Sequence, residues 1–411
     1  MTSLAMLHMD FSLMTLRAIL AIQETGSALK AAQMVHRSQP AVTTALRNFE
    51  KRLDRPLFSR NPRGMTPTPD GRVLCARIGL ALAHLRNGEN YLATRRNPKT
   101  ALPFHRLVHE TQLSALSALL KTGTFSAAAR QLQRAEPSVH RSLRELETLC
   151  GIKLWERYGT RIEPTPEARE LARLGELCKS EWIAGLDEMA EQHGIMNGRV
   201  TVGSLPLARS RWLPAAVAQL VKAYPHAQVA IVDGPYGELL RGLRHGQIDF
   251  VLGALREVKP AKDIVQTPLF DDPLAIVVRA GHPLAIGFDS QNDRLSAPQL
   301  AGLHWILPRL DTPARRRFDE FLIFKGLPLP CNVIECSSLV ATRALLLQSD
   351  HAALLSARQI GIELEAGLLK VLGPALTGTA RSIGITTREG YRPTTLQQKL
   401  LDLLVSLATE V

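Results

Sequence analysis

The chain has 411 residues, of which 45% are hydrophobic and 21% charged, and its formal net charge is +12. This composition excludes a disordered, collagen-like or disulfide-scaffold protein, and the length predicts two or three folded units. No apolar run is long enough to cross a bilayer, and Asp10 and Arg17 interrupt the segment where a signal peptide would have its apolar core. We therefore expect a cytoplasmic protein with no membrane partner.

The positive charge is concentrated near the N-terminus. Residues 1–100 contain 15 Lys and Arg against 6 Asp and Glu, residues 101–197 contain 12 against 13, and residues 198–411 contain 23 against 19. A localized basic field is typical of a domain that binds a polyanion such as double-stranded DNA, although a solvated basic face would give the same count.

A repeat with an offset of 97 residues organises the first half of the chain. Two copies are too few for a solenoid, so we expect a duplicated domain, each copy followed by a connecting helix. The matching positions include Gly26 and Gly123, Arg37 and Arg134, Pro40 and Pro137, Leu46 and Leu143, Glu50 and Glu147, and Pro67 and Pro164.

The first copy has the order of a winged helix-turn-helix. An apolar helix stops at Gly26, a short Ala-rich helix follows at about 28–35, and a third helix starts at Gln39 and Pro40, because proline is tolerated in a first helical turn. The exposed face of the third helix is small, polar and basic, which suits a DNA major groove. Arg63, in the turn of the following hairpin, can reach phosphate or the minor groove. The residues expected to contact DNA are Ser38, Gln39, Pro40, Ala41, Thr43, Thr44, Arg47 and Arg63.

A long helix follows each hairpin, at residues 69–96 and 166–193. The second carries an apolar stripe that must be buried, either against a second chain or against its own winged domain. We expect a second chain, and hence a homodimer or homotetramer. The stripe consists of Leu171, Leu174, Leu177, Trp182, Leu186 and Met189.

The second copy differs where its third helix begins. Glu136 stands where the first copy has Gln39; phosphate repels a carboxylate, although a carboxylate accepts a hydrogen bond from cytosine N4. We therefore assign sequence reading to the first copy. For the second copy, an extended DNA contact through His140, Arg141 and Arg144 and a purely structural role both stay open. A protein-interaction module is the alternative reading of three short helices and a hairpin.

Helices and strands alternate from residue 198 onward, which predicts α/β sheets with parallel strands. The chain crosses into a second lobe near residue 280 and returns near 383–386, so we expect a hinged cleft. Ligands of such folds lie at the carboxyl ends of strands, although a serine there is often only a helix cap. The residues expected to contact an effector are Ser204, Pro206, Leu207, Asp233, Gly253, Phe270, Leu307, Pro308 and Ser338.

The first copy resembles the DNA-binding domain of LysR-type transcriptional regulators. The second copy resembles it more loosely, with Ala135-Glu136-Pro137-Ser138 in place of the family's Ser-Gln-Pro-Ala. Residues 198–405 resemble the family's effector domain, itself similar to type 2 periplasmic binding proteins, and residues 233–256 most resemble the branch of galactose-binding-protein regulators. The motif in the first copy comprises Gly26, Ala31-Ala32, Ser38-Gln39-Pro40-Ala41, Leu57-Phe58-Ser59-Arg60 and Thr66-Pro67-Thr68.

The resemblance implies a multi-domain fold, in which two tandem, mainly α winged helix-turn-helix domains precede a two-lobed α/β effector domain. It implies a DNA-binding transcription regulator that responds to a small molecule such as a sugar or small organic acid. No cofactor or metal is expected, and RNA polymerase is an expected partner. It also favours pairing of protomers through the linker helix. The expected boundaries are 10–68 and 104–165 for the winged domains, 69–103 and 166–197 for the linker helices, and 198–411 for the effector domain.

An α/β solute-binding or enzymatic domain with N-terminal oligomerization repeats is the alternative. We expect no enzyme, because the sequence has no nucleophile elbow, phosphate loop or dinucleotide motif. His105 and His109 have the spacing of metal ligands on a helix but lack the glutamate of a metalloprotease motif. A redox switch through Cys331 and Cys336 is disfavoured, because their spacing along an apparent strand directs them to opposite faces.

Overall fold

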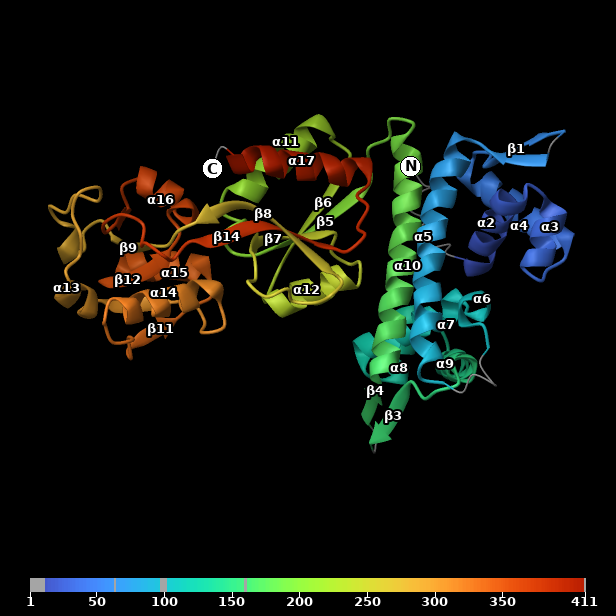
Figure 1. Ribbon diagram of the computed structural model, residues 1–411, viewed down its shortest axis with the longest axis horizontal. Coiled ribbons are helices and arrows are strands. Elements are labelled where there is room, and N and C mark those ends of the chain that lie inside the picture. The colour runs from blue at the N-terminus through green and yellow to red at the C-terminus, as the bar shows by residue number, and fades with distance from the viewer. Residues whose placement is uncertain (1–11, 63, 97–101, 159–160, 410–411) are drawn as a thin grey trace. The chain divides into compact units, whose positions relative to one another are not determined.

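The computed structural model describes residues 12–62, 64–96, 102–158 and 161–409 (Figure 1). The chain forms two compact units. The N-terminal unit comprises Met1–Gly198 with His245–Gln247, and the C-terminal unit comprises Arg199–Arg244 with Ile248–Val411. Among the described residues, no helix is both long and apolar enough to cross a membrane.

The first segment of the N-terminal unit consists of three helices and a hairpin. The first helix ends at Gly26, whose φ of 64° is a left-handed conformation that favours glycine. The Glu50 carboxylate accepts hydrogen bonds from the backbone amides of Leu57 (2.7 Å) and Phe58 (3.3 Å), which holds the hairpin against the third helix. The elements are α2 (Leu13–Thr25), α3 (Ala28–Met34), α4 (Gln39–Leu53), β1 (Phe58–Asn61) and β2 (Gly64–Pro67).

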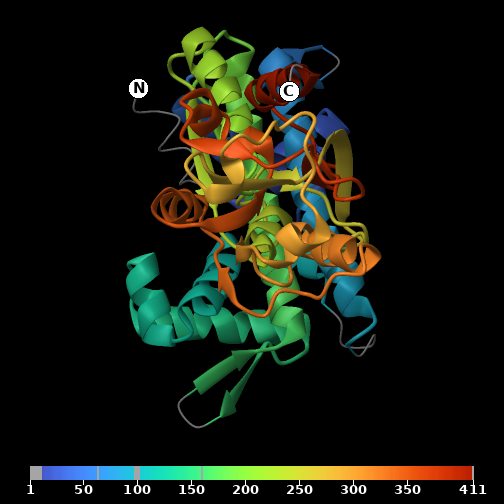
Figure 2. The same cartoon turned by 90° about the vertical axis from the view of Figure 1, so that its left-hand side faces the viewer.

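A second segment has the same order of elements. Glu147, the position equivalent to Glu50, accepts a hydrogen bond from the backbone amide of Leu154 at 2.8 Å. Figure 2 shows its hairpin projecting from the helices. The elements are α6 (Phe104–Leu107), α7 (Glu110–Thr122), α8 (Phe125–Leu132), α9 (Glu136–Cys150), β3 (Trp155–Tyr158) and β4 (Arg161–Pro164).

Two long helices, α5 (Pro69–Ala93) and α10 (Pro166–Glu191), lie side by side in this unit (Figure 1). Thr68 and Thr165 cap them, each accepting a hydrogen bond from a backbone amide of the first turn. The predicted stripe on α10 is buried within the chain: Leu171 and Leu174 lie against α5, and Trp182 lies against Phe49 of α4. The expectation that a second chain covers this stripe is therefore wrong: the sequence pattern shows that a face must be buried, but not which helix buries it.

The two helices approach closely at small residues. A Cβ atom added to Gly185 of α10 would lie 2.8 Å from Cβ of Arg77 and 3.1 Å from Cδ1 of Leu74, both on α5. Arg77 is buried and donates hydrogen bonds from Nη1 to Glu181 (2.7 Å) and from Nε to Glu188 (2.8 Å) of α10. Burial alone would lower the pKa of Arg77, but these hydrogen bonds outweigh burial and hold the pKa above its usual value.

The C-terminal unit contains two five-stranded sheets. The first has the strand order β6-β5-β7-β14-β8 and the second has the order β11-β10-β12-β9-β13. The first lobe contains β5 (Arg199–Ser204), α11 (Trp212–Ala223), β6 (Gln228–Asp233), α12 (Tyr236–Arg244), β7 (Phe250–Ala254), β8 (Ile264–Asp272), β14 (Arg381–Arg388) and α17 (Thr395–Thr409). The second lobe contains β9 (Ala275–Arg279), η1 (Pro283–Ala285), α13 (Ala297–Ala301), β10 (His304–Leu307), α14 (Pro313–Phe324), β11 (Val333–Glu335), α15 (Leu339–Gln348), β12 (His351–Leu355), η2 (Ala357–Gln359), α16 (Gly361–Glu365) and β13 (Leu369–Val371).

Both sheets are mixed, which corrects the expectation of parallel strands. β5 pairs in parallel with β6 and β7, whereas β14 is antiparallel to β7 and β8. The antiparallel strands are those that the chain uses to pass between the lobes, so they enter each sheet without a helical crossover. Asp272, buried where β8 ends, accepts hydrogen bonds from Ser356 (2.5 Å) and Arg381, and so joins both crossing segments to the second lobe.

Three of the five cysteines are buried and none forms a disulfide. Burial raises the pKa of Cys75 and of Cys150 to about 12, and raises the pKa of Cys178 as well. Cys331 is exposed and Cys336 is half-buried. These two residues flank β11 instead of lying within it, so the alternation of a strand does not orient them as the sequence analysis assumed.

We predict that Gly185→Ala destabilises the protein by about 1–3 kcal/mol, because the added methyl group collides with Arg77 and Leu74. Gly79→Ala on α5 is the matched control, since no atom outside its own helix lies within 4 Å of an added Cβ. There the alanine should stabilise the helix by about 0.5–1 kcal/mol. Urea unfolding followed by tryptophan fluorescence measures both; equal effects of the two substitutions would contradict this packing.

We also predict that an aromatic disulfide reagent at pH 8 modifies only Cys331 and Cys336 in the folded chain. With a pKa of about 12, the Cys75 and Cys150 thiols are almost entirely protonated at that pH, and thiolate is the reactive form. Counting released thiolate before and after unfolding in guanidinium checks this. Rapid release of all five equivalents from the folded chain would be inconsistent with the burial described here.

Candidate nucleic-acid interface and effector region

The entry of α4 is built by side-chain capping. The Ser38 hydroxyl accepts a hydrogen bond from the backbone amide of Ala41 at 3.4 Å, and Pro40 lies in the first helical turn. Val42, Leu46 and Phe49 fix the opposite side of the helix in the core. Because the buried residues recur at helical spacing, the other face of α4 is presented to solvent.

The exposed face of α4 is a shallow groove of about 340 Å³. No acidic side chain pairs with Arg47 anywhere in the described parts of the chain. The groove thus offers amide, hydroxyl and guanidinium groups without a competing carboxylate, as a base-reading surface requires. Ser38 and Ala41 are also exposed. The groove is lined by Gln39, Pro40, Thr43, Thr44 and Arg47.

The wing is held by short polar contacts between its two strands. The Ser59 and Thr66 hydroxyls lie 2.9 Å apart, and Asn61 Nδ2 donates to Thr66 Oγ1 at 3.1 Å. Arg63, expected to contact DNA, lies outside the described residues.

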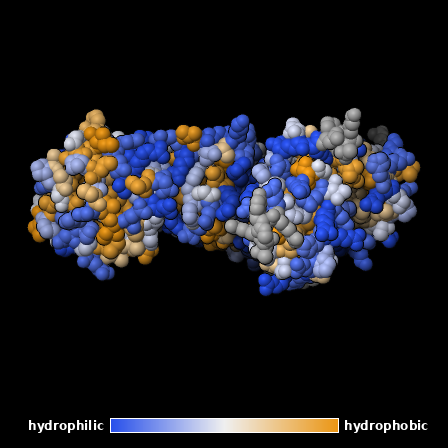
Figure 3. Space-filling model, turned by 90° about the horizontal axis from the view of Figure 1, so that it is seen from below, coloured by the Kyte–Doolittle hydropathy of each residue, from blue (hydrophilic) through white to orange (hydrophobic). Residues whose placement is uncertain are grey.

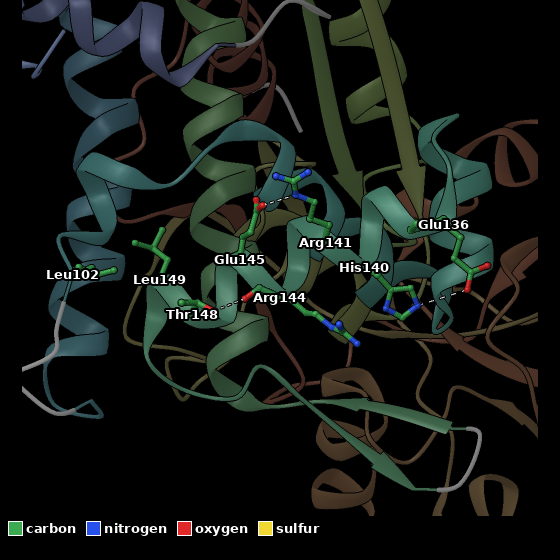
Figure 4. Close-up of a pocket in the computed structure, with 9 residues that line it drawn as sticks. Leu102, Glu136, His140, Arg141, Arg144, Glu145, Thr148 and Leu149 are labelled. Atoms are coloured by element: carbon green, nitrogen blue, oxygen red, sulfur yellow. Dashed lines mark hydrogen bonds and ion pairs between the residues drawn. The ribbon is translucent and has the colours of Figure 1, made fainter.

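The equivalent face of the second segment, on α9, borders a larger hollow of about 940 Å³ (Figure 4). Glu136 accepts a hydrogen bond from Ser126 at 2.5 Å and lies 3.7 Å from His140 Nε2. The His140 ring stacks on Phe125, with a centroid distance of 3.7 Å. The hollow is lined by Leu102, Glu136, Pro137, His140, Arg141, Arg144, Glu145, Thr148 and Leu149.

Glu145 is a residue of this face that the sequence analysis missed. Its carboxylate accepts a hydrogen bond from Arg141 Nε at 2.8 Å, as Figure 4 shows, so Arg141 is partly neutralised. The i, i+4 spacing of the two residues is the signal that could have found it. Arg144 has no acidic partner in the described part of the chain, and therefore carries the available positive charge of this face.

The two histidines lie on different elements and have different partners. His105 lies in α6 and pairs with Glu89, whereas His109 precedes α7 and its backbone amide donates to Gln112. Over the residues that the structure describes, no group of three or more His, Cys, Asp or Glu side chains is arranged to hold a metal ion.

Three of the expected effector residues meet at neighbouring strand ends of the first lobe. Ser204 is buried at the end of β5 and pairs in register with Asp233 of β6 and Leu252 of β7, next to Gly253. Pro206 and Leu207 follow β5 directly. Asp233 is exposed and accepts a hydrogen bond from Arg209 at 2.6 Å.

The remaining effector candidates lie at the end of β10, at the start of α15 and in β8. Leu307 is buried at the end of β10, with Pro308 following it. Ser338 caps α15 by accepting a hydrogen bond from the Ala341 amide at 3.3 Å, which is the alternative role considered for it. Phe270 of β8 packs edge-on against Trp212, with ring centroids 5.5 Å apart.

Two half-buried arginines that lie over aromatic rings were missed. Arg358 lies over the Phe270 ring at 4.6 Å, and Arg256 lies over the Tyr236 ring at 4.0 Å. The Nη1 atom of each arginine is buried without a hydrogen-bond partner. Burial lowers the pKa of Arg256, and a buried guanidinium without an acceptor is stabilised by an anion.

Arg256 follows the end of β7, which β14 separates from Phe270 of β8. Ala254, at the end of β7, pairs with Ile383 of β14, and Ile383 pairs with Phe270 of β8. The next acidic residue, Glu257, bonds to Arg317 of α14 at 2.7 Å, so this loop of the first lobe contacts the second lobe.

Two family models match most of the chain. The model described as the LysR substrate binding domain matches residues 193–408, and the model described as a bacterial regulatory helix-turn-helix protein of the LysR family matches residues 13–72 and 111–169.

Individual relatives agree with this assignment. The chain is 33% identical over 399 residues to the HTH-type transcriptional regulator GalR of Pseudomonas putida, covering 97% of this chain and 98% of the relative. It is 28% identical over 285 residues to PcaQ of Agrobacterium fabrum, covering 69% and 90%. The crystal structure of CbnR, 19% identical, shares the fold with a TM-score of 0.50 over 73% of this chain and 99% of that one. This chain therefore belongs to the LysR family of bacterial transcription regulators.

Proposed function

We propose that the chain regulates transcription by reading operator DNA with the exposed face of α4. The observation that carries this proposal is the groove along α4, in which Arg47 has no acidic partner in the described chain. The groove belongs to the first 100 residues, where 15 basic residues face 6 acidic ones. Amide and guanidinium groups on a helix in the major groove are suited to adenine and guanine edges.

We further propose that the second segment is a second winged helix-turn-helix domain, with the boundaries expected from the sequence. Its element order and the second match of the helix-turn-helix model support this reading. The solved structure of CbnR aligns along 99% of its own length to only 73% of this chain, which leaves room here for one additional domain.

The effector of the C-terminal unit is proposed to be a small carboxylate rather than a neutral sugar. The support is a pair of half-buried arginines, Arg256 and Arg358, whose Nη1 atoms are buried without a hydrogen-bond partner. Phe270 and Trp212 provide an aromatic surface beside Arg358, and Tyr236 lies against Arg256. An effector bound here changes DNA binding only by its differential affinity for two arrangements of the lobes, typically about 1–3 kcal/mol.

Association into a homodimer or homotetramer is proposed to use the second lobe, since α5 already occupies the stripe of α10. Hydrophobic residues gather over this lobe, at the left of Figure 3. In this lobe, Phe324 of α14 is 86% exposed and Val340 of α15 is 76% exposed, which is unusual for large apolar side chains in a monomer. RNA polymerase and a cytoplasmic location complete the proposal, because a regulator of transcription acts on the polymerase at the chromosome.

We predict that Gln39→Ala and Arg47→Ala each weaken operator binding by about 1–3 kcal/mol, because each removes a group able to contact base edges. Lys222→Ala, which removes a charge from the exposed face of α11, is the control and should leave affinity unchanged. Mobility shifts on the chain's own promoter region at fixed salt provide the measurement. Wild-type affinity in both α4 variants would exclude α4 as the reading helix.

For the effector, we predict the result of a thermal-shift screen with small carboxylates, their matched amides and neutral sugars. The carboxylates should raise the melting temperature of the protein more often than the amides or the sugars. Arg256→Met and Arg358→Met should abolish this stabilisation, because each removes a cation whose Nη1 atom is buried without a partner. Arg241→Met on the exposed side of α12 serves as the control. Stabilisation by galactose that survives both substitutions would support the sugar alternative instead.

A further inference from the structure

The contacts between α5 and α10 are reciprocal. Where a residue of α5 meets a residue of α10, the two residues at the equivalent positions, 97 residues away in the sequence, also meet. A Cβ atom added to Gly88 of α5 would lie 3.3 Å from Leu171 and 3.5 Å from Leu174 of α10. Gly185 is the equivalent of Gly88, 97 residues later, and it meets Leu74 and Arg77 of α5. Leu74 and Arg77 are in turn the equivalents of Leu171 and Leu174. Such reciprocal contacts are the property of an interface around a two-fold axis. They also show that the two helices run antiparallel.

Contacts between the two winged segments follow the same symmetry. The backbone amide of Leu13, the first residue of α2, donates to the carboxylate of Glu110, the first residue of α7, at 3.2 Å. These two residues are themselves 97 positions apart. A residue lies against its own equivalent only near a two-fold axis, so the approximate axis relates the complete segments and not just the long helices.

The reading faces are related by the same offset. The groove on α4 and the hollow on α9 are bordered by equivalent positions, although their side chains differ. The equivalent pairs are Gln39 and Glu136, Pro40 and Pro137, Thr43 and His140, Thr44 and Arg141, and Arg47 and Arg144.

We infer that one chain carries a complete pair of DNA-reading heads, the two segments that contain α4 and α9, and that α5 and α10 join them. The face of α9 reads a second half-site whose sequence differs from that of the first. This inference rests on the proposed function, because it requires α4 to read DNA. Two heads related by a two-fold axis match two half-sites on a duplex. Here the heads are not identical, so the two halves of the operator are not identical either.

The side chains of the two faces indicate how the half-sites differ. Gln39 suits the N6 and N7 atoms of adenine, whereas the Glu136 carboxylate accepts from the N4 amine of cytosine. Arg47 and Arg144 are both without acidic partners in the described chain, and each suits guanine or phosphate. The two heads therefore share an arginine and differ at the start of the helix.

The covalent connection explains how a less basic head still binds DNA. Glu145 partly neutralises Arg141, and Glu136 places a second carboxylate on this face beside His140, which weakens the attraction of α9 to phosphate. Once α4 is bound, however, the second head is held beside the duplex at a high effective concentration, so weak intrinsic affinity is sufficient.

Duplexes selected from a random pool by the full-length chain test this inference. We expect a consensus with two blocks of different sequence at a fixed spacing. Arg144→Ala should lower affinity for the consensus about tenfold, and so should its equivalent Arg47→Ala. Each variant should become insensitive to base changes in one block only. Lys222→Ala is the control and should retain wild-type affinity for both blocks.

A consensus with one block, or with two identical inverted blocks, would overturn the inference. So would wild-type affinity of Arg144→Ala for every selected duplex while Arg47→Ala loses affinity, since the second segment would then be structural. If no duplex is selected, or if Arg47→Ala also binds normally, the proposed function itself fails.

Discussion

Burial of one long helix against another is the constraint on which the N-terminal unit depends. Neither α5 nor α10 has a core of its own, and each carries an apolar face about as long as itself. Packing them together buries both faces within one chain, which removes the need for a second chain at this surface. The close approach at Gly88 and Gly185 allows this packing, because larger side chains would separate the helices.

A buried ion pair makes the helix pair specific. Arg77 of α5 bonds to Glu181 and Glu188 of α10, and the position equivalent to Arg77 on α10 is Leu174. Likewise, Phe49 of α4 packs against Trp182 with ring centroids 5.4 Å apart, while their equivalents are Leu146 and Leu85. These one-sided contacts favour the α5–α10 combination over a pairing of two like helices. A buried charge without its partner is costly, so mismatched pairs are disfavoured.

Much of this architecture could be predicted from the sequence, because its signals are local. The start of α4 at Gln39 follows from Ser38 and Pro40, and the end of α2 follows from Gly26. The partner of α10 could not be predicted, because an apolar stripe does not specify what covers it. Arg256 and Arg358 were missed for a similar reason: only the fold shows that their Nη1 atoms are buried without a hydrogen-bond partner. Nor does alternation of helices and strands show that β14 is antiparallel to its neighbours.

The central claim, that the two heads are paired within one chain, is tested most directly by a distance measurement between them. Thr44 and Arg141 are exposed equivalent positions, and a spin label is attached to each after substitution by cysteine. Cys331 and Cys336 are replaced by serine so that they take up no label. Pulsed electron paramagnetic resonance then measures the distance between the two labels. Pairing within the chain predicts one narrow distance distribution that persists when labelled chains are refolded with a large excess of unlabelled chains. A broad distribution, or a signal lost on dilution, would contradict it.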